Sequence, residues 1–112
     1  MKLFAGLKKI REYEKLQLPF VKSLFDFDIV VEIGLSEELG RPLTLKQLFL
    51  QEISSRATIR RKLTLLIEQG IVIRRQDESD HRASVLTIAP SSLKLLTKYG
   101  SALTAISALH FK

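Results

Sequence analysis

The chain contains no cysteine, only three prolines, and no uninterrupted apolar run of membrane-spanning length. Without cysteine there can be no disulfide, no thiolate zinc site and no cysteine nucleophile. Charged residues recur every few positions, which argues against a membrane span. The first residues, MKLFAGLKKIREYEKLQLP, are also charged and lack a small-residue cleavage pattern, so they do not resemble a secretory signal. These absences predict a cytoplasmic protein with no membrane partner.

Motifs for catalysis are missing as well. The sequence has no glycine-rich phosphate loop, no G-x-S-x-G and no histidine-rich metal motif. Asp77, Glu78 and Asp80 form an acidic cluster, but a solvated hairpin tip offers no burial to shift a carboxyl pKa. His81 and His110 have no third ligand nearby in the sequence. We therefore expect neither an enzyme nor a bound metal or cofactor.

What the chain does have is an uneven positive charge. Its 112 residues, 46% hydrophobic and 27% charged, fit one domain with a modest core, and the net charge is +6. Residues 1–40 hold six basic and seven acidic residues, residues 41–82 nine and five, and residues 83–112 three and none. The basic middle and tail suggest a surface that could meet phosphates, although many basic domains bind no nucleic acid.

The N-terminal third has the apolar periodicity of helices. In residues 2–17, Leu3, Leu7 and Ile10 share one face. Pro19 suits the first turn of a second helix over residues 19–35, which is apolar around most of its circumference. The alternation in FDFDI leaves a strand as the alternative there. The following SEELGRP predicts a loop.

Two capped helices are predicted in the middle of the chain. Thr44 is the expected N-cap of a short helix, and Ser55 that of a longer one, RATIRRKLTLLIEQ, which ends where Gly70 can adopt a left-handed conformation. A turn of about three residues between two helices, the second basic on its open face, matches a helix-turn-helix.

The residues after Gly70 complete the pattern. IVIRR and ASVLTI, separated by a charged turn, predict a two-stranded β-ribbon directly after the second helix. We therefore predict a mainly α fold with a small β-hairpin (α+β), a winged helix-turn-helix over about residues 43–89. Helices at about 1–35 and 91–112 would flank it in a single domain, 1–112. Such a unit places the helix in the DNA major groove and the hairpin tip near the adjacent minor groove.

The stretches LTLKQL, SSRATIRRKLTLLIEQGIVIRR and DESDHRASVLTI resemble the MarR (multiple antibiotic resistance regulator) family of transcription factors, over about residues 43–89. The resemblance implies a sequence-specific regulator that binds double-stranded DNA, with Arg82 in the minor groove and Asp80 helping to hold it. It also implies a small, often phenolic effector between the dimerisation helices and the winged domain. The DNA-binding residues that we predict are Thr44, Lys46, Ser55, Arg56, Thr58, Arg60, Arg61, Lys62, Arg74, Asp80, His81 and Arg82, with Ser55, Thr58 and Arg61 as recognition-helix positions and Arg56, Arg60 and Lys62 as phosphate contacts.

Simpler interpretations stay open. The basic residues of the second capped helix could be a solvated face. Arg74 and Arg75 could have no role beyond an ion pair with Asp77 or Glu78. A winged helix can also serve protein contact, or act in a replication or partition module that binds DNA non-specifically.

The C-terminal segment is shorter than the paired terminal helices of the MarR family. Its apolar side chains nevertheless recur at spacings of three and four, a seam that one helix cannot bury alone; they are Leu96, Tyr99, Leu103, Ile106 and His110. The seam could pack on the N-terminal helix of the same chain or of a partner. We favour a partner, and hence a homodimer through the N- and C-terminal helices on an inverted repeat, because one winged helix contacts a single half-site.

Overall fold

The computed structural model describes all residues, 1–112. Its elements are, in chain order, α1 (Leu3–Gln17), α2 (Leu24–Glu38), β1 (Leu43–Thr44), α3 (Leu45–Leu50), α4 (Arg56–Glu68), β2 (Val72–Gln76), β3 (Ser84–Ile88) and α5 (Pro90–His110). The chain divides into two compact units. We call Met1–Val21 with Pro90–Lys112 the terminal unit, and Lys22–Ala89 the central unit.

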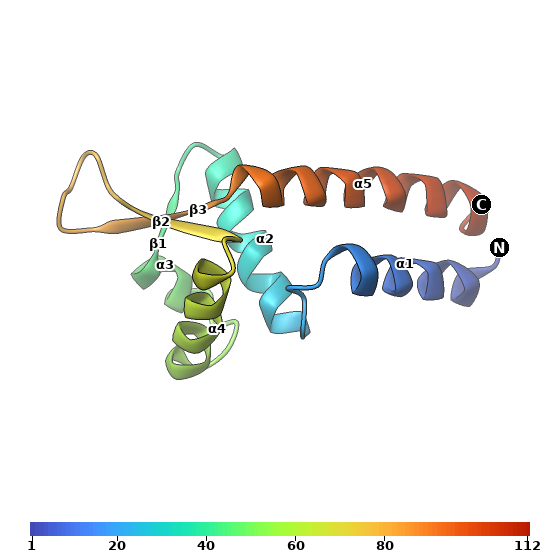
Figure 1. Cartoon of the computed structure of the whole chain (residues 1–112), viewed down its shortest axis with the longest axis horizontal. Coiled ribbons are helices and arrows are strands. Elements are labelled where there is room, and N and C mark those ends of the chain that lie inside the picture. The colour runs from blue at the N-terminus through green and yellow to red at the C-terminus, as the bar shows by residue number, and fades with distance from the viewer. The chain divides into compact units, whose positions relative to one another are not determined.

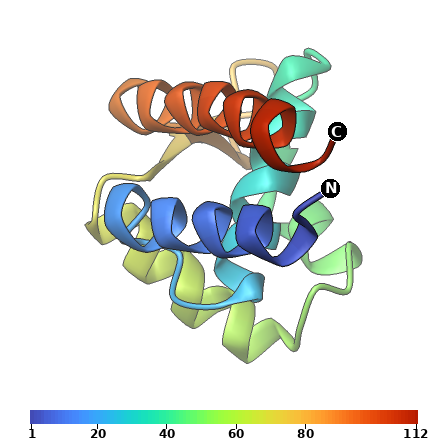
Figure 2. The ribbon, with the colours of Figure 1, turned by 90° about the vertical axis from the view of Figure 1, so that its right-hand side faces the viewer.

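The terminal unit is an antiparallel pair of helices. Helices α1 and α5 lie side by side with both chain ends at the same end of the pair (Figures 1 and 2). There the backbone N–H of Lys2 donates to the carbonyl of His110 at 2.8 Å. A Cβ on Gly6 would lie 2.2 Å from the Phe111 ring, so α1 approaches the C-terminus as closely as glycine permits. The C-terminal helix thus packs on α1 of the same chain, one of the two arrangements predicted for its seam, and packing on a partner stays a prediction.

Aromatic packing fixes the middle of this pair. The rings of Tyr13 and Tyr99 stack with centroids 5.9 Å apart. The Tyr99 hydroxyl donates a hydrogen bond to the Glu14 carboxylate. Burial, and then the bond to Glu14 and its negative charge, raise the pKa of Tyr99 above its usual value.

The central unit combines three helices with a small antiparallel sheet in the order β1-β3-β2. The predicted ribbon is confirmed, with Val72 opposite Ile88 and Gln76 opposite Ser84. Strand β1, which pairs Leu43 with Leu86, was not predicted, because two residues are too short to show any alternation. The fold is mainly α with a small β-sheet, as expected.

The core of the central unit comes from the apolar faces of its helices and from apolar strand residues. α2 packs on β3 and α4 packs on β2. The buried apolar side chains are Ile29, Val30, Ile33, Leu43, Leu48, Ile59, Leu63, Leu66, Val72, Leu86, Ile88 and Ala89. Their burial fixes α4 against the sheet, which leaves its opposite face open to solvent.

Helix α2 differs from its predicted bounds at both ends. It begins at Leu24, not at Pro19, because Ser23 and Asp26 form a capping box that defines a later start. It continues to Glu38, three residues into the segment predicted as a loop, and ends before Gly40, which has a φ of 74°. The helix, and not the strand suggested by FDFDI, is the correct alternative.

The connection between α3 and α4 is longer than the predicted turn of about three residues. It spans Gln51–Ser55, because α3 already ends at Leu50. Glu52 has a φ of 54°, a left-handed conformation that stops the helix before the residues expected to continue it. None of the helices has both the length and the apolar character to cross a membrane.

Candidate nucleic-acid interface

Helix α3 is fixed at its start by a reciprocal cap. The Thr44 hydroxyl accepts from the backbone N–H of Gln47 at 3.2 Å, and the Gln47 side chain accepts from the backbone N–H of Thr44 at 2.9 Å. The predicted cap at Thr44 is therefore confirmed, and its side chain is already engaged within the protein. Lys46, in the first turn, is exposed.

Helix α4 begins at the predicted cap. The Ser55 hydroxyl accepts from the backbone N–H of Thr58 at 3.2 Å and donates to the Thr58 hydroxyl at 2.9 Å. Capping of this kind stabilises a helix by about 1 kcal/mol. Arg61 is exposed and has no carboxylate partner, so its guanidinium is free to meet a ligand.

Two more arginines of α4 share one aromatic ring. The guanidinium carbons of Arg56 and Arg60 lie 5.3 Å and 5.1 Å from the centroid of Phe49, on α3. Both arginines are exposed and lack a carboxylate partner. A cation over an aromatic face is attracted by about 0.5–1 kcal/mol at an exposed site. Phe49 thus gathers two unneutralised positive charges beside the α3–α4 turn.

Lys62 lies in different surroundings. Its ammonium donates to the Ser23 hydroxyl at 3.1 Å and to the Asp26 carboxylate at 3.3 Å. The side chain is only 13% exposed, and that of Asp26 8%. Among the four basic side chains of α4, Lys62 alone is neutralised by an internal carboxylate, which argues against the phosphate contact that we predicted for it.

The wing presents its cations on β2 and in the turn. Arg74 and Arg75 are exposed and have no ion pair, so neither is neutralised by Asp77 or Glu78. The register places Arg74 opposite Leu86, hence on the face of the sheet that carries the core, at its outer edge.

The turn of the wing is held by side-chain bonds to its backbone. Asp80 Oδ1 accepts from the backbone N–H of Arg82 at 3.0 Å, and the Gln76 amide donates to the carbonyl of His81 at 2.6 Å. Asp77 accepts from the backbone N–H and the hydroxyl of Ser79. The side chains of His81 and Arg82 are exposed. Asp80 thus acts on the backbone of Arg82 and not on its guanidinium.

Three residues of this region, Phe49, Gln76 and Asp26, were not predicted from the sequence. Nothing in the spacing of the sequence connects Phe49 with arginines on the next helix. Gln76 is the last residue of β2, and no sequence motif marks it. Asp26 could have been found, because the spacing Ser23-x-x-Asp26 before an apolar run is a capping-box signature; only its bond to Lys62 could not.

The central unit therefore presents exposed, unpaired arginines on α4 and a projecting hairpin that carries Arg74 and Arg82 (Figure 1). No group of three or more His, Cys, Asp or Glu residues could hold a metal ion. A helix-turn-helix followed at once by an antiparallel ribbon is a winged helix.

Comparison with family models and with curated proteins gives no match. Solved structures do match. The MepR–DNA complex of S. aureus superposes with a TM-score of 0.71 at 15% identity, over 96% of this chain and 86% of that one. AbsC, a MarR family transcriptional regulator from Streptomyces coelicolor, gives 0.61 at 23% identity, over 97% and 72%. A MarR mutant from E. coli complexed with operator DNA gives 0.60 at 16% identity, over 88% and 67%.

These similarities extend over most of the chain, terminal helices included. The protein therefore has the winged-helix fold of the MarR-type regulators, as the resemblance in its sequence implied. Of these three structures, AbsC is named as a transcriptional regulator, and the other two are complexes with DNA.

Proposed function

We propose that the protein is a sequence-specific, DNA-binding transcriptional regulator. In this proposal α4 enters the major groove, Arg61 reads a base, Arg56 and Arg60 contact phosphates, and Arg82 of the wing occupies the minor groove. Ser55, Thr58, Thr44, Lys46, Arg74 and His81 complete the contact surface. The protein would then work in the compartment that holds DNA, which agrees with the cytoplasmic location expected from the sequence.

The observation that carries this proposal is the pattern of neutralised and free cations on α4. Arg56, Arg60 and Arg61 are exposed without a carboxylate partner, whereas Lys62 is paired inside the protein. Unpaired cations on the exposed face of a capped helix are costly to hold close together unless an anion is bound there. A phosphate backbone supplies that anion, and the groove beside it admits a helix.

We also propose that the protein acts as a homodimer through its terminal units. Packing of α1 on α5 leaves large apolar side chains exposed, among them Phe4 (79%) and Leu109 (78%). Leu3, Leu7, Leu16 and Leu93 are further members of this set. A second copy can cover such a surface, and two copies would place two recognition helices on an inverted repeat.

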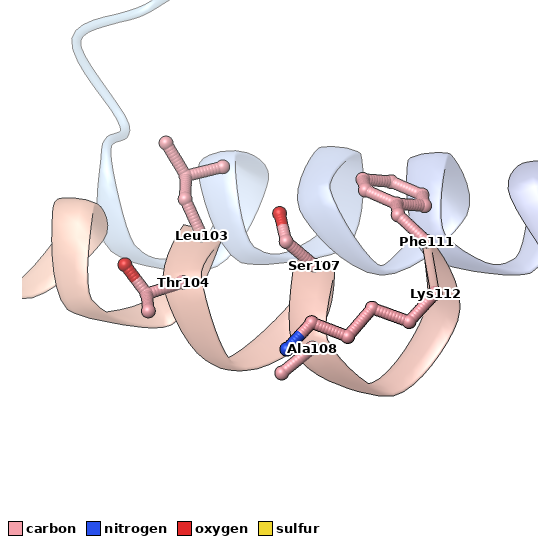
Figure 3. A pocket seen from close by; sticks show the side chains of 6 residues that line it. All are labelled: Leu103, Thr104, Ser107, Ala108, Phe111 and Lys112. Atoms are coloured by element: carbon pink, nitrogen blue, oxygen red, sulfur yellow. The ribbon is translucent and has the colours of Figure 1, made fainter.

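An open cavity on α5 supports the same proposal. Its volume is about 520 Å³, and Figure 3 shows two rows of side chains along one flank of the helix, Leu103–Ser107–Phe111 and Thr104–Ala108–Lys112. Leu103 and Phe111 line it with apolar surface, so an exposed leucine or phenylalanine of a partner could fill the cavity. A small-molecule effector remains part of the proposal without an assigned site, and its test is a change in DNA affinity on adding phenolic compounds.

Selection of bound sequences from random duplex DNA tests the function. We expect an enriched inverted repeat, with half-sites spaced by about one helical turn. Affinity for the selected site should fall steeply with salt, because phosphate contacts release counterions. If no sequence is enriched but low-salt binding persists, the protein is a non-specific replication or partition module. Absence of binding at low salt would instead indicate a winged helix used for protein contact.

A further inference from the structure

One carboxylate of the central unit has more partners than a helix cap needs. Asp26, in the first turn of α2, is 6% exposed. Its Oδ2 accepts from the backbone N–H groups of Lys22 at 3.1 Å and Ser23 at 2.8 Å, and from the Ser23 hydroxyl at 3.1 Å. Its Oδ1 accepts from the Lys62 ammonium of α4 at 3.3 Å. One carboxylate oxygen thus bonds the chain just before α2, and the other bonds α4, the helix that carries the recognition arginines.

The position of these partners in the chain matters. Lys22 is the first residue of the central unit, directly after Val21, where the first segment of the terminal unit ends. Asp26 therefore fixes the backbone at the point where the chain enters the central unit. Lys62 also donates to Ser23, which closes a network of three side chains from two elements. A displacement of the incoming chain at Lys22 and Ser23 must either break this network or move α4 with it.

Lys62 needs an anionic partner because its charged side chain is only 13% exposed. Removal of a cation from solvent is costly, and only a nearby anion with further hydrogen bonds offsets that cost. Asp26 and Ser23 supply both. A second carboxylate of α2 provides the contrast, since Glu37 accepts from the backbone N–H of Ile88 at 3.0 Å, just before the chain leaves the central unit, and has no bond to α4.

We propose that Asp26 is a positioning residue for DNA binding, which sets α4 through Lys62 and links it to the chain entering from the terminal unit. This inference rests on the proposed function, because its effect is exerted on the recognition helix. Lys62 is then a tether of α4 and makes no phosphate contact. The network predicts that Asp26 and Lys62 act as a pair, so that loss of either has the same effect on DNA binding as loss of both.

The experiment is a double-mutant cycle on the selected duplex, with Asp26→Asn, Lys62→Met and the double variant. Affinity is measured over a series of salt concentrations, at a temperature at which circular dichroism shows each variant folded. We expect each single substitution to weaken binding by about five- to tenfold, within the range of coupling between contacting charged residues, and the double variant to be no weaker than either. The slope of log affinity against log salt should stay that of the wild type in all three.

Matched controls separate a positioning role from a general loss of stability. Glu37→Gln removes the charge of the other anchoring carboxylate of α2. The fold-loss of DNA affinity that it causes should multiply with that of Lys62→Met, as for independent sites. Lys62→Arg keeps the positive charge beside Asp26 and should restore part of the affinity. If Asp26→Asn does not fold, Lys62→Met and Lys62→Arg still give the affinity and the slope that decide the matter.

Three results would overturn the inference while leaving the function intact. Losses that multiply in the double variant would mean that the two residues act independently. Wild-type affinity in the folded variants would reduce the network to a structural cap. A salt slope lowered by about one in Lys62→Met, together with tighter binding by Asp26→Asn, would make Lys62 a phosphate contact released from its internal partner. Failure of the wild-type protein to bind any duplex would be different, since it removes the proposed function itself.

Discussion

Arg82 and Asp80 show how an acidic residue could be tolerated at the surface that we propose binds DNA. Asp80 bonds the backbone N–H of Arg82, so it shapes the turn from which the arginine projects. A turn fixed in advance reduces the entropy lost when the side chain enters a groove. The repulsion between Asp80 and phosphates opposes this benefit, and substitutions at the two residues separate the contributions.

Arg82→Ala should weaken binding to the selected duplex by about 1 to 3 kcal/mol and lower the salt slope by about one per wing. Asp80→Ala should weaken it as well, because the backbone bond is lost. Asp80→Asn keeps an acceptor oxygen without the charge and should bind at least as tightly as the wild type. Titrations at several salt concentrations measure all three. Tighter binding by Asp80→Ala, with Arg82→Ala unchanged, would mean that the wing is only a solvated hairpin.

Phe49 is the second residue whose chemistry goes beyond packing. Because its ring attracts both Arg56 and Arg60, Phe49→Leu should weaken DNA binding by about 1 kcal/mol while the number of phosphate contacts, and hence the salt slope, is kept. Phe49→Tyr retains an aromatic face and serves as the matched control, with affinity near that of the wild type. Equal affinities for folded Phe49→Leu and Phe49→Tyr would show that the ring does not orient the arginines.

At the scale of the elements, the sequence predicted what local chemistry encodes. Thr44, Ser55 and Gly70 mark helix ends because a cap or a left-handed turn depends on one or two neighbouring residues. The ribbon was predicted because apolar and β-branched residues flank a charged turn. The start of α2 was misplaced because two N-terminal signals, Pro19 and the Ser23–Asp26 box, competed within a few residues.

Other features could not be predicted because they depend on residues far apart in the chain. Strand β1 exists only because β3 offers an edge on which Leu43 and Thr44 can pair. The bond between Asp26 and Lys62 joins residues 36 positions apart. Basic residues on one helix look alike in sequence, and only the fold distinguishes the ion-paired, half-buried Lys62 from the exposed Arg61. The candidate surface was thus predictable as a set of positions, whereas the partners of each side chain were not.

The wing is an element whose rigidity can be tested directly. The Gln76 amide crosses the hairpin to the His81 carbonyl, next to the tip. Gln76→Ala should therefore speed hydrogen exchange of the backbone amides between residues 77 and 83 and leave α4 unaffected. Arg75→Ala, at an exposed neighbour without a hydrogen bond to the turn, is the control. Unchanged exchange in Gln76→Ala would mean that the aspartate bonds alone hold the tip.

At the scale of the whole molecule, the proposed dimerisation through the terminal unit would decide whether one DNA half-site or two can be bound. Leu109 is 78% exposed on α5, so Leu109→Lys should disturb the α1–α5 pair little while it removes apolar surface from a dimer interface. Sedimentation at tens of micromolar should show a dimer for the wild type and a monomer for the variant. Leu50→Lys, an exposed leucine of the central unit at 66%, should remain dimeric. A monomeric wild type would end the dimer proposal.

Stability of the terminal unit should depend on the protonation of one half-buried hydroxyl, that of Tyr99. Burial, and then Glu14, raise the pKa of Tyr99 in the folded state, so the neutral phenol is favoured there relative to the unfolded chain. The resulting stabilisation is complete below the unfolded pKa of about 10 and is lost as the pH rises above it, because ionised Tyr99 would face the Glu14 carboxylate without a proton to donate.

Thermal unfolding followed from about pH 8 to about pH 11 should therefore show a fall in stability that Tyr99→Phe makes shallower, since phenylalanine cannot ionise. Below this range Tyr99→Phe should be the less stable protein, because it lacks the hydrogen bond to Glu14. Tyr13→Phe keeps the stacked ring and leaves Tyr99 to titrate, so its pH dependence should match that of the wild type. An equally steep fall in Tyr99→Phe would assign the alkaline transition to other groups, and the Tyr99–Glu14 bond would then stabilise the pair of helices without setting its pH range.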